Sequence, residues 1–476
     1  MKVKKVLIFT RPWEVRFHLA LANELALTLD VDVEFATFFS KARWIIENKS
    51  NRMHKVYYMP ELLQSADLSK WNQEYFETMD CRMSKIIGAN FNMMLLAERF
   101  LPQKQKDIEL FYKRHFLVLD SIISDGTLTM TSFIDHFVYW IASGIAWSKG
   151  GCHFGSCTIG MPANYTTYYK NPFEIWKKNV SMDYTDDILR EAIEKLNIPM
   201  RKRVDYAIKT PRPGIIRRFK HTLNEIKFEK IDASYGSYFQ FYSPINSRLF
   251  GHIKHFFKKL LPKDRLNFGI TSKEQLTFDY IYYPLHYEPE ATIMMLSPWY
   301  KDQLEITRLV AQALPVGMKL VVKDHPQMYT IRDSSYYVKL KSIPNVVLCS
   351  PTIEGPVLTR NCVGLVSISG TAAVEAAMLG KHTICYGNPP FKDTLECVHV
   401  ANGFKQTQLH ALFIKWRNDK RVMVNHEGWH KWASSLCKTS VVPKNNGFEY
   451  EIIPEEQRVC TILQHILDCL KYENFI

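Results

Sequence analysis

The sequence lacks a segment that would cross a membrane or direct secretion. Its longest uncharged apolar stretch, 137–147, is well short of the roughly 20 residues that a membrane-spanning helix needs. The apolar run behind the basic N-terminal residues stops at Arg11-Pro12, which is too early for a signal peptide. We therefore expect a cytoplasmic protein.

The sequence also lacks the cysteine spacing of a zinc site or a disulfide framework. Its ten cysteines are scattered, and the close pair Cys152 and Cys157 is neither a CxxC motif nor matched by a second pair. No low-complexity tract or short repeat is visible, and no helix-turn-helix, zinc-finger or RNA-recognition signature is present. We expect neither a metal site nor a nucleic-acid partner.

What the chain does have is the length and composition of a two-domain folded protein. Its 476 residues exceed one hydrophobic core, and 46% are hydrophobic and 23% charged. Lysine and arginine outnumber aspartate and glutamate by 61 to 48, with much of the excess in 201–203, 217–221 and 252–265. The last segment interleaves apolar and basic residues, which suits a helix on an anionic membrane surface or, equally, a solvated connector.

The N-terminal half begins with the pattern of a doubly wound α/β domain. An apolar run at 5–9, helical spacing at 17–29 and a β-branched run at 31–35 predict strand, helix and strand. Arg11 and Trp13 would then lie in the loop at the carboxyl end of the first strand, where open α/β sheets bind ligands. The alternative is that Trp13 only packs against the next helix.

A second strand end in this half carries ionisable residues. A helix at 107–124 is followed by Asp125-Gly126, typical of a helix end, and by a strand at 128–133. Asp135 and His136 stand where this strand ends and a helix begins, again at the ligand edge. From 159 to 278 the pattern weakens, apart from a helix at 186–196.

Strands and helices alternate again from residue 279, which predicts a second parallel sheet. Strands are expected at 280–285, 319–322, 345–349, 364–368 and 383–386, and helices at 300–314, 372–379 and 454–472. We therefore predict an N-terminal domain over 1–278, a C-terminal domain over 279–453, and a closing helix over 454–476.

The strongest local signals are two strand ends of the second alternation. Lys323-Asp324-His325-Pro326 follows one strand, and Ser367-Ile368-Ser369-Gly370-Thr371 follows another. The serine, glycine and threonine open a helix, whose free N–H groups favour a phosphate. Ser369 or Thr371 would alternatively serve only as the helix N-cap.

These motifs, with Tyr283 to Thr292, Gly380-Lys381 and Tyr386-Gly387, resemble the capsule polysaccharide biosynthesis family, which includes bacterial Kdo transferases. The His-Pro pair followed by a Ser/Thr motif is also similar to bacterial sialyltransferases with CMP-activated donors. The resemblance covers 279–390. It implies a GT-B fold, with two Rossmann-like domains of parallel sheet facing across a cleft. The domain over 1–278 would lie on the acceptor side and the domain over 279–453 would bind the nucleotide sugar, with no required metal or other cofactor.

The resemblance also implies roles for residues of the second domain. His325 would contact the donor's phosphate or nucleotide, and Pro326 would shape that turn. Glu375 would reach ribose hydroxyls, unless it is an ordinary surface carboxylate. The full donor-binding set is Lys323, His325, Pro326, Ser367, Ser369, Gly370, Thr371 and Glu375, with Arg11, Trp13, His286 and Glu288 as cleft or acceptor candidates.

Sugar transfer requires a group that takes a proton from the acceptor hydroxyl or stabilises the developing sugar cation. The catalytic candidates are Asp135 and His136 in the first domain and Glu290 in the second. Asp125 ranks below Asp135, because Asp125-Gly126 also reads well as a helix end and Ser124 replaces the first acid of the sialyltransferase acidic pair.

The sequence thus predicts a glycosyltransferase that moves a sugar, with Kdo or a related ulosonic acid from a CMP donor as first choice, onto a capsule, lipopolysaccharide or other surface glycan. Its partners would be a nucleotide sugar, a glycan or glycolipid acceptor and, through the basic segments, an anionic membrane. A UDP-N-acetylglucosamine 2-epimerase on the same fold and a non-catalytic assembly protein remain alternatives.

Overall fold

The fold is taken from a computed structural model, which divides the chain into two compact units. Unit 1 comprises 1–180, 201–242 and 434–476, and unit 2 comprises 181–200 and 243–433. The residues that the structure describes are 2–96, 98, 105–131, 136–158, 165–171, 173–196, 227–236, 268–288, 291–294, 296–297, 300, 302–325, 328, 332–394, 406–419, 426–438, 442–444, 449–451 and 455–476.

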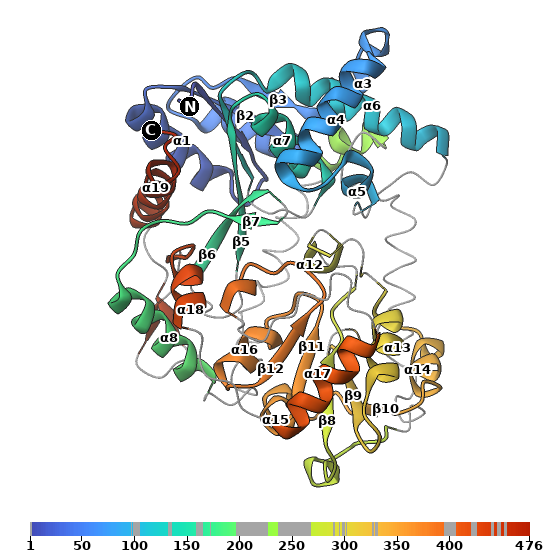
Figure 1. Cartoon of the computed structure of the whole chain (residues 1–476). Coiled ribbons are helices and arrows are strands. Elements are labelled where there is room, and N and C mark those ends of the chain that lie inside the picture. The colour runs from blue at the N-terminus through green and yellow to red at the C-terminus, as the bar shows by residue number, and fades with distance from the viewer. Residues whose placement is uncertain are drawn as a thin grey trace. The chain divides into compact units, whose positions relative to one another are not determined.

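Unit 1 contains a mainly parallel sheet with the order β13-β6-β5-β4-β1-β2-β3 (Figure 1). Strands β1 to β5 run parallel to one another, whereas β6 runs antiparallel to β5, β7 and β13. Its elements up to the second unit are β1 (Lys5–Phe9), α1 (Val15–Leu29), β2 (Asp32–Thr37), α2 (Ser40–Lys49), β3 (Val56–Tyr58), α3 (Met59–Ser65), η1 (Leu68–Lys70), α4 (Gln73–Ile87), α5 (Phe91–Leu96), α6 (Gln105–Ile122), β4 (Thr127–Thr131), α7 (Phe137–Ser148), β5 (Cys152–Thr158), β6 (Tyr165–Asn171) and β7 (Glu174–Ile175).

The end of the chain returns to unit 1. Strand β13 (Cys437–Lys438) extends the sheet beside β6, and helix α19 (Glu455–Tyr472) lies beside α1 (Figure 1). Ile462 and Ile466 of α19 join Val6 and Leu25 in one hydrophobic core, where each fully buried side chain contributes roughly 1.5–3 kcal/mol. The helix predicted at 454–472 is therefore built into the core of the first unit. The small hairpin of β14 (Val442–Lys444) and β15 (Glu449–Glu451) precedes it.

Unit 2 is built on a five-stranded, fully parallel sheet with the order β10-β9-β8-β11-β12. Its elements are α8 (Met182–Leu196), η4 (Lys273–Gln275), β8 (Tyr280–Pro284), α12 (Ala291–Met294), α13 (Gln303–Ala313), β9 (Lys319–Lys323), α14 (Ser334–Lys341), β10 (Val346–Cys349), α15 (Gly355–Asn361), β11 (Gly364–Ser367), α16 (Ala372–Met378), β12 (His382–Cys385), η6 (Lys392–Thr394), α17 (Gln406–Asn418) and α18 (His426–Ala433).

One face of the unit 2 sheet packs against α13, α14 and α17 in a single core cluster. Val310 of α13, Leu340 of α14 and Phe413 of α17 are all buried against sheet residues such as Val322. Asp302 begins α13 as its N-cap and accepts hydrogen bonds from the N–H groups of Leu304 and Glu305. Because all five strands run the same way, their carboxyl ends share one edge of this sheet.

The predicted α/β class with parallel sheets is confirmed in each unit. The division between units differs from the predicted boundaries at three places, since 181–200 and 243–278 group with unit 2 and 434–453 group with unit 1. Helix α8 groups with unit 2, where Thr185 hydrogen-bonds His430 of α18 at 2.9 Å, and residues after 433 group with unit 1. A helical stretch at 227–234 belongs to unit 1, since Asp232 accepts from Ser40 N and from Tyr58 OH at 2.8 and 2.7 Å.

Candidate functional site

The strand order of unit 2 reverses between β8 and β11, which is where open α/β sheets bind ligands. His286 lies just beyond β8, and Ser367 is the last residue of β11. The Nε2 atom of His286 is 3.3 Å from Ser367 Oγ and accepts a 3.2 Å hydrogen bond from the backbone N–H of Ile368. The histidine, predicted only as a cleft residue, therefore joins the two strands at the reversal.

The environment of His286 keeps its ring uncharged. Burial, with a contribution from the charge of His325, lowers the pKa of His286 to about 4. An Nε2 atom that accepts a backbone N–H carries no proton itself. His286 thus acts at neutral pH as a hydrogen-bonding partner of the β11 loop and not as a cation.

The loop after β11 is packed too closely for a side chain at position 370. A Cβ atom on Gly370 would lie 2.8 Å from Cε1 of His286 and 3.1 Å from Ser367 Oγ. Instead, the N–H of Gly370 donates to Ser367 Oγ at 3.0 Å. Thr371 is the N-cap residue of α16, but its side chain makes no capping hydrogen bond, so the alternative that it serves only as a cap is not what this geometry shows.

The remaining residues predicted to hold the donor take different positions around this edge. Ser369 is buried, Thr371 is exposed, and Glu375 is half-buried in the first turn of α16. Lys323 ends β9 and is buried, which lowers its pKa. Pro326 lies outside the described residues.

His325 lies just beyond the end of β9 and is partly exposed to solvent. It is half-buried, and its ring meets that of Tyr287 edge to face with centroids 6.0 Å apart. Burial lowers its pKa, and the nearby Asp324 carboxylate opposes this effect. His325 and His286 therefore follow adjacent strands, β9 and β8, at the same edge.

An arginine that sequence reasoning missed connects these two strand ends. Arg332 donates from Nη1 to Glu288 at 2.6 Å, from Nε to Asp324 at 3.1 Å and from Nη2 to the backbone oxygen of His286 at 3.0 Å. Its side chain is only 5% exposed. Burial disfavours its charge, but Asp324 and Glu288 outweigh this and raise the pKa of Arg332 above its usual value. We call Arg332, Asp324 and Glu288 the arginine clamp.

Two further side chains, Tyr337 and Gln303, hydrogen-bond the carboxylates of the arginine clamp. Asp324 accepts the backbone N–H of His325 at 2.8 Å and the hydroxyl of Tyr337. Gln303, on the first turn of α13, accepts the N–H of His286 at 2.6 Å and donates to Glu288. Asp324 stood inside the recognised Lys-Asp-His-Pro motif, whereas no local pattern marks Arg332 or Gln303.

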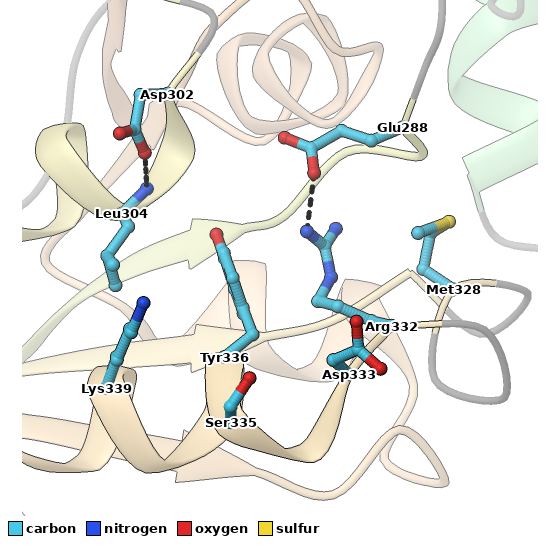
Figure 2. A pocket seen from close by; sticks show the side chains of 9 residues that line it. All are labelled: Glu288, Asp302, Leu304, Met328, Arg332, Asp333, Ser335, Tyr336 and Lys339. Carbon is cyan, nitrogen blue, oxygen red and sulfur yellow. Dashed lines mark hydrogen bonds and ion pairs between the residues drawn. The ribbon is translucent and has the colours of Figure 1, made fainter.

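A cavity of about 590 Å³ opens beside the clamp (Figure 2). Its lining residues come from the loop after β8, the start of α13, and the start of α14 with the chain before it. They are Glu288, Asp302, Leu304, Met328, Arg332, Asp333, Ser335, Tyr336 and Lys339. The predicted residue Glu288 thus faces both the arginine clamp and this cavity.

In unit 1, Arg11 occupies the corresponding edge of the other sheet, after β1. It is buried, donates to the hydroxyl of Tyr139 at 3.3 Å, and its guanidinium lies 5.7 Å from the ring centroid of Trp13. Trp13 is 64% exposed and contacts Phe39, just before α2, edge to face. The indole therefore packs against the entry to α2 and still presents most of its surface to solvent.

The predicted catalytic residues of unit 1 separate in space. His136 is fully buried just before α7, with Nδ1 3.2 Å from Glu98, and the N–H of Phe137 donates to the same carboxylate. Asp125 is exposed and precedes β4, so it lies at the amino edge of the sheet, opposite the edge that carries Arg11. Asp135 and Glu290 lie outside the described residues.

A comparison with protein families finds one match in this part of the chain. Residues 267–394 match the family described as capsule polysaccharide biosynthesis protein. The matched segment lies within unit 2. It contains β8 to β12 and every residue of the arginine clamp and of the contacts between His286 and the β11 loop.

Curated proteins yield no significant match, whereas solved structures yield distant ones. KpsC of Thermosulfurimonas dismutans, a beta Kdo 2,7 transferase, is 11% identical and aligns over 83% of this chain and 97% of its own, with a TM-score of 0.32. Its beta Kdo 2,4 transferase part is 12% identical over 71% and 86%, with a TM-score of 0.29. UDP-GlcNAc 2-epimerase from Neisseria meningitidis is 13% identical over 98% and 100%, with a TM-score of 0.23.

The described part of the chain offers neither a metal-binding cluster nor a membrane-spanning helix. No group of three or more histidine, cysteine, aspartate or glutamate side chains there is arranged to hold a metal ion. Nor does any helix among the described residues combine the length and the apolar character needed to span a bilayer. The basic segments at 201–203, 217–221 and 252–265 lie outside the described residues.

Replacing the clamp arginine should destabilise the protein strongly. We expect Arg332→Met to lower the free energy of unfolding by about 3–5 kcal/mol, because it leaves the buried carboxylate of Asp324 without its cation. Urea denaturation measures the change. The control is Arg417→Met, whose pair with Asp279 is partly exposed and should cost less than about 1 kcal/mol. Equal losses in the two variants would contradict the clamp.

The lowered pKa of His286 predicts an acid-dependent term in stability. The unfolded chain binds this proton near pH 6.5 and the folded chain only near pH 4, so stability falls as pH drops through this window and is independent of the group above it. The resulting loss in the free energy of unfolding amounts to about 3 kcal/mol by pH 4. We expect the acid-induced loss in His286→Gln to be smaller by this amount in urea titrations from pH 7 to 4. A His286 NMR resonance that titrates near pH 6.5 would disprove the assignment.

Proposed function

We propose that this protein is a glycosyltransferase of surface-polysaccharide assembly that uses a nucleotide sugar. The observation that carries the proposal is the contact of His286 with Ser367 and Ile368 at the strand reversal, inside the segment that matches the capsule polysaccharide biosynthesis family. A reversal edge that carries hydroxyl groups and opens a helix suits a phosphorylated ligand.

The donor is proposed to bind along this edge. Thr371, which makes no capping bond, and the backbone around Gly370 would hold a phosphate from the β11 side. His325 and Lys323 would approach from the β9 side, with Glu375 near the ribose. Because burial lowers the pKa of Lys323, an adjacent phosphate would help to keep this lysine charged.

The finer proposal concerns the sugar and its acceptor. A CMP-activated ulosonic acid such as Kdo is the first choice, in keeping with the motif resemblance, and the acceptor is a capsule, lipopolysaccharide or other surface glycan. Transfer is proposed to need no metal. The basic segments are proposed to bring the protein to the inner face of the cytoplasmic membrane.

Proton removal from the acceptor is proposed to involve Asp135 or His136 in unit 1, or Glu290 in unit 2. The carboxylate of Glu98 lies 3.2 Å from Nδ1 of His136 and thereby orients the imidazole ring. Asp125 stands at the opposite edge of the unit 1 sheet, and this position argues against a catalytic role for it.

Nucleotide binding tests the donor class. We expect CMP to raise the melting temperature more than UDP or GDP, with or without EDTA, because a ligand that binds only the folded state stabilises it. His325→Ala and Thr371→Val should reduce the shift. Ser342→Ala, at the far end of α14, is the matched control and should not. A larger shift with UDP would reject the CMP donor, and no shift with any nucleotide would reject the proposed function.

Charge-removing variants test the catalytic group. We expect Asp135→Asn to reduce turnover on the order of a hundredfold while nucleotide binding barely changes, since a base acts in the transition state. Asp125→Asn is the control and should retain turnover. If Glu290→Gln loses turnover and Asp135→Asn does not, the catalytic group lies in unit 2. Nucleotide-sugar turnover without an acceptor would instead indicate an epimerase.

A further inference from the structure

The cavity beside the arginine clamp has the size of a ligand site and is open to solvent. It lies between the starts of α13 and α14, and its volume of about 590 Å³ falls in the usual range for pockets that bind small molecules. Figure 2 shows the side chains of Glu288, Asp302, Tyr336 and Lys339 around this space. None of the residues predicted to hold the donor phosphate lines it.

The charges of the lining disfavour an anion. Three carboxylates, Glu288, Asp302 and Asp333, face two cations, Arg332 and Lys339. The charge of Arg332 is moreover shared with Asp324, which is outside the lining, at 3.1 Å. A phosphate or a carboxylate-bearing sugar would therefore meet more negative than positive charge.

The same lining suits a neutral ring rich in hydroxyl groups. Carboxylates accept hydrogen bonds from hydroxyls strongly, whereas Ser335 and Lys339 can donate to ring and hydroxyl oxygens. Leu304 and Met328 add apolar surface for the C–H face of such a ring. Tyr336 is held in place, because the Arg332 guanidinium lies 4.5 Å from its ring centroid.

We propose that this cavity binds a neutral sugar residue, as a subsite separate from the donor phosphate. If the proposed function holds, this residue belongs to the acceptor glycan. The arginine clamp then gives the subsite a direct structural connection to the donor edge, since Glu288 lines the cavity and its partner Arg332 holds the backbone of His286. The arginine clamp would thus position residues at both the neutral-sugar site and the donor site, although the two ligands would contact different residues.

A blocking variant tests the subsite. Ser335→Trp places an indole in the cavity, and Val338→Trp, on the exposed side of the same helix, is its matched control. The probes are the methyl glycosides of glucose, galactose and N-acetylglucosamine, with Kdo as the anionic comparison. We expect saturation-transfer NMR to detect at least one neutral glycoside on the wild type and on Val338→Trp, with the signal reduced at least fivefold in Ser335→Trp.

Lys339→Ala provides a second, milder variant and should reduce the same signal at least twofold, because it removes a donor from the exposed rim. Absence of every neutral glycoside signal, a stronger signal from Kdo, or a signal unchanged in Ser335→Trp would overturn the proposal. The CMP-induced rise in melting temperature of Ser335→Trp distinguishes the sugar subsite from the proposed function. If Ser335→Trp keeps this rise but loses glycoside binding, the subsite is separate from the donor site. If no nucleotide raises the melting temperature of the wild type, the proposed function is rejected while the sugar site is unaffected.

Discussion

The buried charge of Arg332 is the constraint on which the ligand edge of unit 2 depends. One guanidinium contacts a carboxylate after β9, a carboxylate after β8 and the backbone oxygen of His286. Each of these acceptors would be costly to leave unpaired beneath the surface. Asp324, Glu288 and the backbone of His286 are thus held in place before any ligand arrives, which spares a ligand the entropic cost of ordering them.

His286 is uncharged in this arrangement, so it supplies no positive charge for a ligand at the edge of the unit 2 sheet. Its ring is committed to Ser367 and to the N–H of Ile368, and burial keeps its pKa far below neutrality. Positive charge for a phosphate must therefore come from elsewhere, and Lys323 at the end of β9 is a predicted source. His286 instead keeps the β8 and β11 loops in register, so its effect on a ligand is exerted through the position of the β11 loop.

The sequence predicted the unit 2 sheet in full and only β1, β2 and β4 of the unit 1 sheet. Strands buried on both faces appear as continuous apolar runs, and those of β8 to β12 were placed within two residues of their ends. Helix α7 was expected only as a helix that begins after His136, without an end, because it is buried nearly all round and lacks the alternation that marks a surface helix. Arg332 escaped prediction since its partners are 8 and 44 residues away and meet it only in the folded sheet. By contrast, Ser367 and His325 were found because strand ends at one edge can be inferred from chain order alone.

The distribution of charge along this edge connects the two proposed sites. The β11 loop, from Ser367 to Thr371, offers hydroxyl and N–H groups and contains no acid. The opposite end, between α13 and α14, carries Asp302 and Asp333 in the cavity lining. An anionic donor is therefore favoured on the β11 side and disfavoured on the α14 side, while a neutral sugar meets no such penalty. Arg332 contributes to this segregation, because its guanidinium pairs with Asp324 and Glu288 at the boundary and offsets part of their negative charge beside His325.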